Sequence, residues 1–159
     1  MAHRLTPVHL EFADSAPLRL VFTAEVRARP DAVYRALAED VTDWPEWFRA
    51  VASARPTGRG TGREVRLRGG TRFQETIMSA EPGERYAYRI DETNAPGVRA
   101  MVEDWRLSPT SSGTRVQWTM AVAGSAPVRF ALKLARPGVG RAFEDAVRRL
   151  DRRLAGASA

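Results

Sequence analysis

The stretch Trp44-Pro45-Glu46-Trp47-Phe48 is the most informative one for the fold. Its apolar bulk is too dense to be left entirely in water, so this short segment has to pack against the rest of the chain. It follows a segment in which Pro30 fits the first turn of a helix running to about Glu39, since the fixed φ and missing N–H of proline cost nothing there. Val33 and Leu37 lie one turn apart on this helix and mark its inner face. The sequence therefore predicts two consecutive short helices or turns, the second built on the tryptophan pair.

Strands flank these two helices on both sides. Residues 18–26 alternate between apolar and mostly polar side chains, which is the period of a strand with one buried face. From Ala50 to about Gly124, further strand patterns are separated by turn signals such as Gly69-Gly70. Connections this short favour an antiparallel meander, and Gly113-Thr114-Arg115-Val116-Gln117-Trp118 begins its last strand.

A long helix is predicted at the C-terminus. Phe143, Val147 and Leu150 recur at spacings of four and three, which puts them on one stripe of a helix that can lie in a concave sheet. Pro137-Gly138 interrupts the pattern. Either the helix is kinked there, or a short helix that contains Phe130 precedes the main one.

Composition limits the chain to one domain and few chemistries. A length of 159 residues with 43% hydrophobic content can bury one substantial core but not two ordinary ones. Without cysteine there is no disulfide framework or thiolate chemistry, and nothing requires an oxidising compartment. No segment approaches the roughly 20 apolar residues of a membrane helix, and the N-terminus lacks a secretory pattern. We therefore expect a soluble, cytoplasmic protein.

The order of strand, two short helices, antiparallel strands and long terminal helix resembles the START-like superfamily, also called Bet v 1-like or helix-grip. Within it, the chain is similar to bacterial polyketide cyclase/dehydrase-type proteins over residues 17–155, with residues 1–16 as an N-terminal arm. The resemblance implies an α+β fold, in which a strongly bent antiparallel sheet of about seven strands wraps around the last helix. A cavity is expected between them.

The cavity implied by this resemblance suggests two functions. The first is binding of a hydrophobic or amphipathic small molecule as a carrier, sensor or accessory protein; the alternative is a cofactor-independent polyketide aromatase/cyclase. By similarity, the lining would consist of Trp44, Trp47, Phe48, Phe73, Tyr88, Trp105, Trp118, Phe130 and Phe143. The competing interpretation is that these aromatic residues simply fill the core.

Two carboxylates stand out from the strand pattern. Glu75 shares parity with Phe73, and Glu103 shares parity with Trp105, so both should point into the apolar side. A buried carboxylate needs a partner or a raised pKa, and such groups are candidates for general acid and base chemistry. The alternative is that a bulge turns them to solvent or an arginine neutralises them. Asp104 has outward parity and is expected in water.

Other site chemistries and partners are disfavoured. The only histidines, His3 and His9, lie in the arm, which speaks against a zinc site or a catalytic triad, and no glycine-rich nucleotide signature is present. We therefore expect no metal and no cofactor. The net charge of +6 comes almost entirely from arginines that are interspersed with acidic residues. That pattern is typical of a solvated surface, so we expect no nucleic-acid partner, while peripheral membrane contact stays open but is not favoured.

Overall fold

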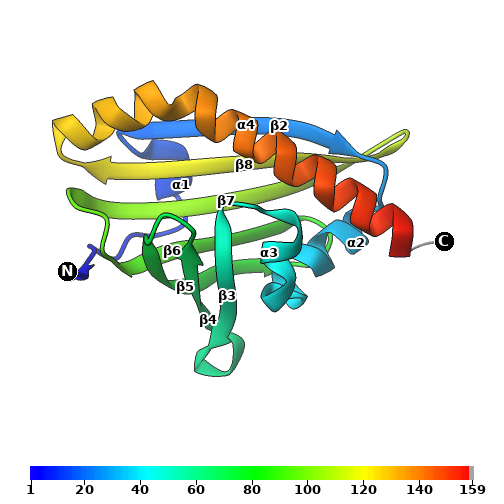
Figure 1. The fold of residues 1–159 in the computed structure, drawn as a ribbon, viewed down its shortest axis with the longest axis horizontal. Helices are drawn as coiled ribbons and strands as arrows, with labels where there is room; N and C mark the ends of the chain where they lie inside the picture. The colour runs from blue at the N-terminus through cyan, green and yellow to red at the C-terminus, as the bar shows by residue number, and fades with distance from the viewer. Residues whose placement is uncertain (158–159) are drawn as a thin grey trace.

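A curved antiparallel sheet that lies against one long C-terminal helix dominates the structure, a computed structural model that describes residues 1–157 (Figure 1). Its elements in chain order are β1 (His3–Arg4), α1 (Phe12–Ser15), β2 (Leu18–Val26), α2 (Pro30–Tyr34), η1 (Arg35–Glu39), η2 (Val41–Asp43), α3 (Trp44–Trp47), β3 (Val51–Thr57), η3 (Gly58–Gly60), β4 (Gly62–Leu67), β5 (Arg72–Glu81), β6 (Arg85–Thr93), β7 (Val98–Thr110), β8 (Gly113–Gly124) and α4 (Ala126–Ala157). No helix within residues 1–157 has the length and apolar content needed to cross a lipid bilayer.

The sheet follows the predicted meander. Its strand order is β2-β8-β7-β6-β5-β4-β3, and along this path the pairing of β2 with β8 joins strands that are distant in the chain, whereas the other neighbours are consecutive. β1 adds an eighth strand by pairing with β6, where His3 lies opposite Thr93. These pairings are antiparallel, and the predicted α+β fold with a bent sheet around the last helix is confirmed.

The two short helical segments after the first long strand are also present. α2 begins at Pro30, and its last turn continues into the π-helical η1. η2 and α3 then bring the tryptophan pair into the core, where Trp44 donates a hydrogen bond from Nε1 to the Leu37 carbonyl at 3.0 Å. This bond joins the two segments, and the ring of Trp44 meets Trp105 of the sheet edge-on at 5.7 Å.

Helix α4 is continuous through Pro137, so the chain forms no separate short helix before it. Figure 1 shows the helix changing direction in its orange part, as expected where a proline removes a backbone hydrogen bond. Phe143, Val147 and Leu150 are buried after this point, as the stripe predicted. Before it no residue of the helix is fully buried, so the two halves of α4 have different surroundings.

The N-terminal arm packs against the outside of the sheet. α1 contacts β7 and β8, and Ala13 is buried there with Val102 and Ala121. These residues form a small apolar cluster separate from the main core. The convex face is therefore partly covered, while the concave face holds the main core with α3 and α4.

Candidate functional site

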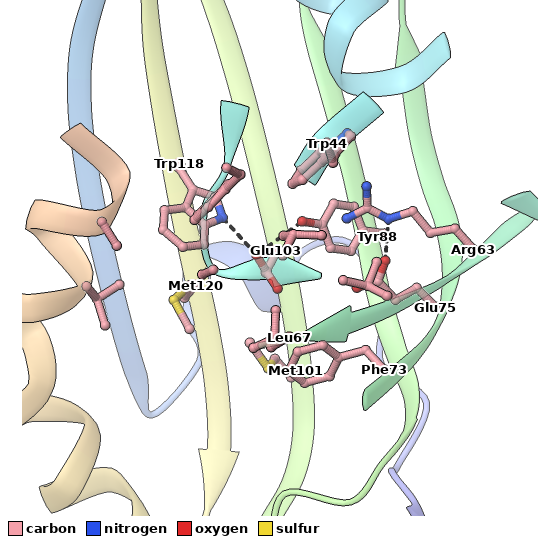
Figure 2. Close-up of a pocket in the computed structure, with 16 residues that line it drawn as sticks. Trp44, Arg63, Leu67, Phe73, Glu75, Tyr88, Met101, Glu103, Trp118 and Met120 are labelled. Carbon is pink, nitrogen blue, oxygen red and sulfur yellow. Dashed lines mark hydrogen bonds and ion pairs between the residues drawn. The ribbon is translucent and has the colours of Figure 1, made fainter. Parts of the chain in front are cut away.

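A cavity of about 200 Å³ lies between the concave face of the sheet, α3 and the middle of α4 (Figure 2). Its wall is largely apolar and comes from strands β3 to β8 and these two helices. The lining residues are Trp44, Phe48, Ala50, Val51, Arg63, Val65, Leu67, Phe73, Glu75, Tyr88, Met101, Glu103, Trp118, Met120, Val139 and Ala142.

The cavity reaches the surface on one side. Ala50 is exposed, and Leu67, Phe73 and Met120 are half-buried, whereas the polar residues of the wall are buried. Val139 lies just after the Pro137 bend of α4 and lines the same region. The site thus has an apolar mouth and a buried polar end.

Arg63 and Glu75 form an ion pair at the polar end, with both side chains almost fully buried. Cross-strand pairing positions them, because Arg63 on β4 is the Cα partner of Glu75 on β5. The neighbouring Gly62 makes this close pairing possible, since a Cβ at Gly62 would lie 2.5 Å from the Glu75 carbonyl oxygen. Arg63 Nε donates to Glu75 Oε1 (Figure 2).

Aromatic rings enclose the guanidinium of Arg63. Its central carbon lies 4.3 Å from the ring centroid of Trp44 and 4.1 Å from that of Tyr88. At such distances the ring faces attract the cation, and the attraction is stronger in a desolvated site. Nη1 of Arg63 is buried and has no hydrogen-bond partner among residues 1–157.

Glu103 is held by neutral donors instead of a cation. Trp118 donates from Nε1 to Glu103 Oε1 at 2.9 Å, and the Tyr88 hydroxyl donates to the same oxygen at 3.1 Å (Figure 2). Tyr88 in turn accepts a hydrogen bond from Trp105 Nε1 at 3.3 Å. Glu103 Oε2 receives neither of the two bonds, so this oxygen is left for other contacts at the cavity wall.

Burial sets the protonation of this cluster. It raises the pKa of Glu75 to about 7, although Arg63 lowers that pKa. Burial likewise raises the pKa of Glu103 against the opposing effects of Arg63, Trp118 and Tyr88. Burial lowers the pKa of Arg63, but Glu75 and the tyrosines outweigh it and raise the pKa, so the guanidinium stays charged. Near neutral pH the cluster therefore holds the cation of Arg63 and a Glu75 carboxyl group that is close to its own pKa.

Seven of the expected site residues meet at the cavity. These are the two carboxylates Glu75 and Glu103 and the aromatic residues Trp44, Phe48, Phe73, Tyr88 and Trp118. Trp47, Trp105 and Phe143 do not line it, which corrects the expectation for these three. They are at most 1% exposed and pack in the surrounding core, where Trp105 lies 6.1 Å from Phe143 between ring centroids.

Two further expectations need correction. Phe130 is 64% exposed, because Val128 and Leu132 take the side of α4 that faces the core and Phe130 lies on the other side. Asp104 is 1% exposed rather than in water. Arg85 and Arg106 bond its carboxylate at 2.9 to 3.0 Å on the outer face of the sheet.

The sequence reasoning missed Arg63 and Met101. Arg63 shares parity with Val65 and Leu67, so the alternation that placed Glu75 inward also placed this arginine inward. Met101 shares parity with Glu103 in the same way. The expectation that an arginine can neutralise a buried glutamate holds at Glu75, although burial keeps its pKa high.

Comparisons with known proteins agree with this architecture. An uncharacterized protein of Mycobacterium tuberculosis is 35% identical over 150 residues, which cover 91% of this chain and 89% of that protein. The solved structure of XoxI from Bacillus cereus matches with a TM-score of 0.70 at 14% identity, covering 89% of this chain and 98% of that one. A START superfamily protein from Mycobacterium smegmatis matches with a TM-score of 0.68 at 14% identity, covering 87% and 98%.

The two structural likenesses, at such low identity, concern the fold alone. The family comparison goes further, because residues 17–155 match the family described as "Polyketide cyclase / dehydrase and lipid transport". These residues contain the complete cavity wall. The chain therefore belongs to this polyketide cyclase/dehydrase and lipid transport family.

Proposed function

We propose that the protein binds a hydrophobic or amphipathic small molecule in its internal cavity and serves as a carrier, sensor or accessory protein. The observation that carries this proposal is the cavity itself, about 200 Å³ in volume, with an apolar wall and a few convergent polar groups at one end. Ligand sites have this composition, since apolar surface supplies affinity and placed polar groups supply orientation.

The direct test is mass spectrometry of an organic extract from the purified protein, with a mock purification as control. We expect a stoichiometric compound of low polarity. Replacing Phe73 in the cavity wall with alanine should reduce its recovery, whereas the same change at the exposed Phe130 should not. Equal recovery from both variants would contradict binding in the cavity.

A second function, cofactor-independent cyclisation of a polyketide chain, is favoured by one specific observation. Burial raises the pKa of Glu75 to about 7, which is where a general acid or base is effective at neutral pH. Glu103 and the hydroxyl of Tyr88 lie at the same wall and extend this proton-handling group. In this mechanism the carboxyl groups move protons while the cavity shape positions the chain.

Glu75→Gln separates the two functions. A binder keeps its ligand affinity in this variant, because the amide is of similar size and still accepts from Arg63. An enzyme keeps binding but loses turnover, so kcat falls while KM changes little. If Glu75→Gln and Glu103→Gln both leave turnover of a polyketide-like compound unchanged, neither carboxyl group is the acid or base.

A further inference from the structure

The first half of α4, before the bend at Pro137, has two apolar sides. Val128 and Leu132 pack against the core, whereas Phe130 and Leu134 are 64% and 67% exposed. Phe130 and Leu134 stand one turn apart on the side away from the core. Figure 1 shows this part of the helix, in yellow and orange, at the periphery of the molecule beside β2 and β8. Large apolar side chains exposed in a row indicate an interaction surface.

The charges of α4 differ between its two halves in the same way. Residues 125–143 contain no acidic residue and four basic ones, which are Arg129, Lys133, Arg136 and Arg141. Residues 144–157 hold three acidic residues beside four arginines. Arg141 is exposed and lies on the side of Phe130 and Leu134, since seven residues make about two turns, and the exposed Lys133 flanks this side. We call Phe130, Lys133, Leu134 and Arg141 the outer stripe, which is both apolar and basic.

A lipid bilayer matches the outer stripe better than a protein does. A protein interface of standard size buries about 800 Å² on each partner around an apolar centre, and two large apolar side chains on a convex helix do not supply that. A second copy of the chain fits less well still, because a two-fold contact would bring Lys133 and Arg141 of both copies together. A bilayer needs no matching pocket, since its fluid interface receives single apolar side chains and its anionic headgroups attract cations.

We propose that the outer stripe docks the protein on the surface of an anionic lipid bilayer. Phe130 and Leu134 enter the boundary between headgroups and acyl chains, while Lys133 and Arg141 contact lipid phosphates. The cavity wall contains no residue of the outer stripe, so docking does not require a ligand in the cavity. Val139 and Ala142 of the same helix line the cavity, and the docked helix therefore holds the cavity next to the bilayer.

Sedimentation with sucrose-loaded vesicles tests the docking on the unmodified protein. One set of vesicles is phosphatidylcholine alone, and the other contains about 25% phosphatidylglycerol, which gives the surface a negative potential. Each basic residue near such a surface contributes about fivefold, so the protein should bind the anionic vesicles more tightly by about tenfold or more. Binding should weaken as the salt concentration rises, because salt screens the charges.

Variants of the exposed side chains locate the contact. Phe130→Ala and Leu134→Ala should each weaken binding to the anionic vesicles about tenfold, because each removes apolar surface that enters the bilayer. Arg141→Gln should weaken it about fivefold. The matched control is Arg148→Gln, because Arg148 is an exposed arginine of the same helix with Glu144 and Asp145 in the turn before it. All four side chains are exposed, so urea denaturation should show unchanged stability.

Three results would overturn the proposal. The first is equal binding to both kinds of vesicle, or binding to neither. The second is an equal loss in Arg141→Gln and Arg148→Gln, which would mean that the charge of the whole helix acts instead of the outer stripe. The third is self-association in the absence of vesicles that Phe130→Ala abolishes, which would assign the outer stripe to a second copy of the chain. None of these results concerns the cavity, so failure of the docking leaves the proposed function intact.

Discussion

Glu75 and Glu103 occupy the same cavity wall but are stabilised in different ways. Glu75 on β5 is paired with the buried cation of Arg63 on the neighbouring strand. Glu103 on β7 accepts hydrogen bonds from two neutral donors, Trp118 and Tyr88. One carboxyl group thus depends on a charge and the other on aromatic side chains that also form the core.

The two carboxyl groups therefore differ in how much stability is lost when one of their partners is removed. A buried ion pair gains little net stability when it forms, but removing one partner leaves an uncompensated charge. A hydrogen bond from a neutral donor is weaker, and losing one of two leaves the acceptor partly satisfied. Removing the ion-pair partner of Glu75 should therefore lower the free energy of unfolding more than removing one hydrogen-bond donor to Glu103.

The largest effect is expected from Arg63→Met. Methionine fills much of the volume but leaves Glu75 buried without its cation, so the free energy of unfolding should fall by about 3–5 kcal/mol. Urea denaturation measures this change. The matched control is Arg115→Met, because Arg115 pairs with Glu25 on the exposed surface at 3.3 Å and such pairs contribute about 0–1 kcal/mol. Similar losses in both variants would contradict a special role for the buried pair.

Trp118→Phe tests the Glu103 side and should cost about 2 kcal/mol, part from the lost indole N–H bond and part from lost ring volume. Trp47→Phe is the control, because Trp47 is also buried but its Nε1 has no hydrogen-bond partner among residues 1–157. The difference between the two variants in urea denaturation isolates the bond to Glu103. No difference would mean that this bond adds nothing to stability.

The sequence predicted the two carboxylates of this comparison but not the way each is held. Alternation along β5 and β7 is enough to place Glu75 and Glu103 on the apolar side, since side-chain direction depends only on parity. The partner of Glu75 depends on the register between β4 and β5, because Arg63 lies opposite Glu75 only in the register observed. Register is a property of strand pairs, and a single strand pattern does not contain it.

The positions of three other residues, Phe143, Phe130 and Asp104, were predicted less well for a related reason. The helical stripe predicted that Phe143 is buried, but the packing of α4 against the sheet decides whether it lines the cavity or the core behind it. Phe130 was expected at the cavity by similarity to the family, whereas the first half of α4 turns that side to solvent. Asp104 is buried on the outer face between two arginines, which strand alternation alone does not reveal.

Tyr88→Phe should have a smaller effect than Trp118→Phe, about 1 kcal/mol. It removes one of two donors to Glu103 and the acceptor for Trp105, but it keeps the ring that packs against Arg63. Thermal unfolding measures the loss, with Tyr34→Phe as a control for the hydroxyl group because Tyr34 lies outside these hydrogen bonds. A loss as large as that of Arg63→Met would overturn the distinction between the two sides.

The pH dependence of stability also depends on Glu75. Burial raises the pKa of Glu75 to about 7 from an unfolded value of 4.5, so between these values the folded state binds more protons than the unfolded state. This contribution to stability is fully present below pH 4.5 and is lost as the pH rises through about 7. The slope is at most about 1.4 kcal/mol per pH unit for one group.

Hydrogen bonds from Arg55 and Gln74 lower the pKa of Glu64 to about 2. The contribution of Glu64 to stability therefore has the opposite sign to that of Glu75, and it changes only below pH 4.5. Urea denaturation at a series of pH values above 4.5 should therefore show falling stability in the unmodified protein. The slope should be flatter in Glu75→Gln, because the amide does not titrate. A slope that the substitution leaves unchanged would show that Glu75 is ionised throughout, and that Arg63 outweighs its burial.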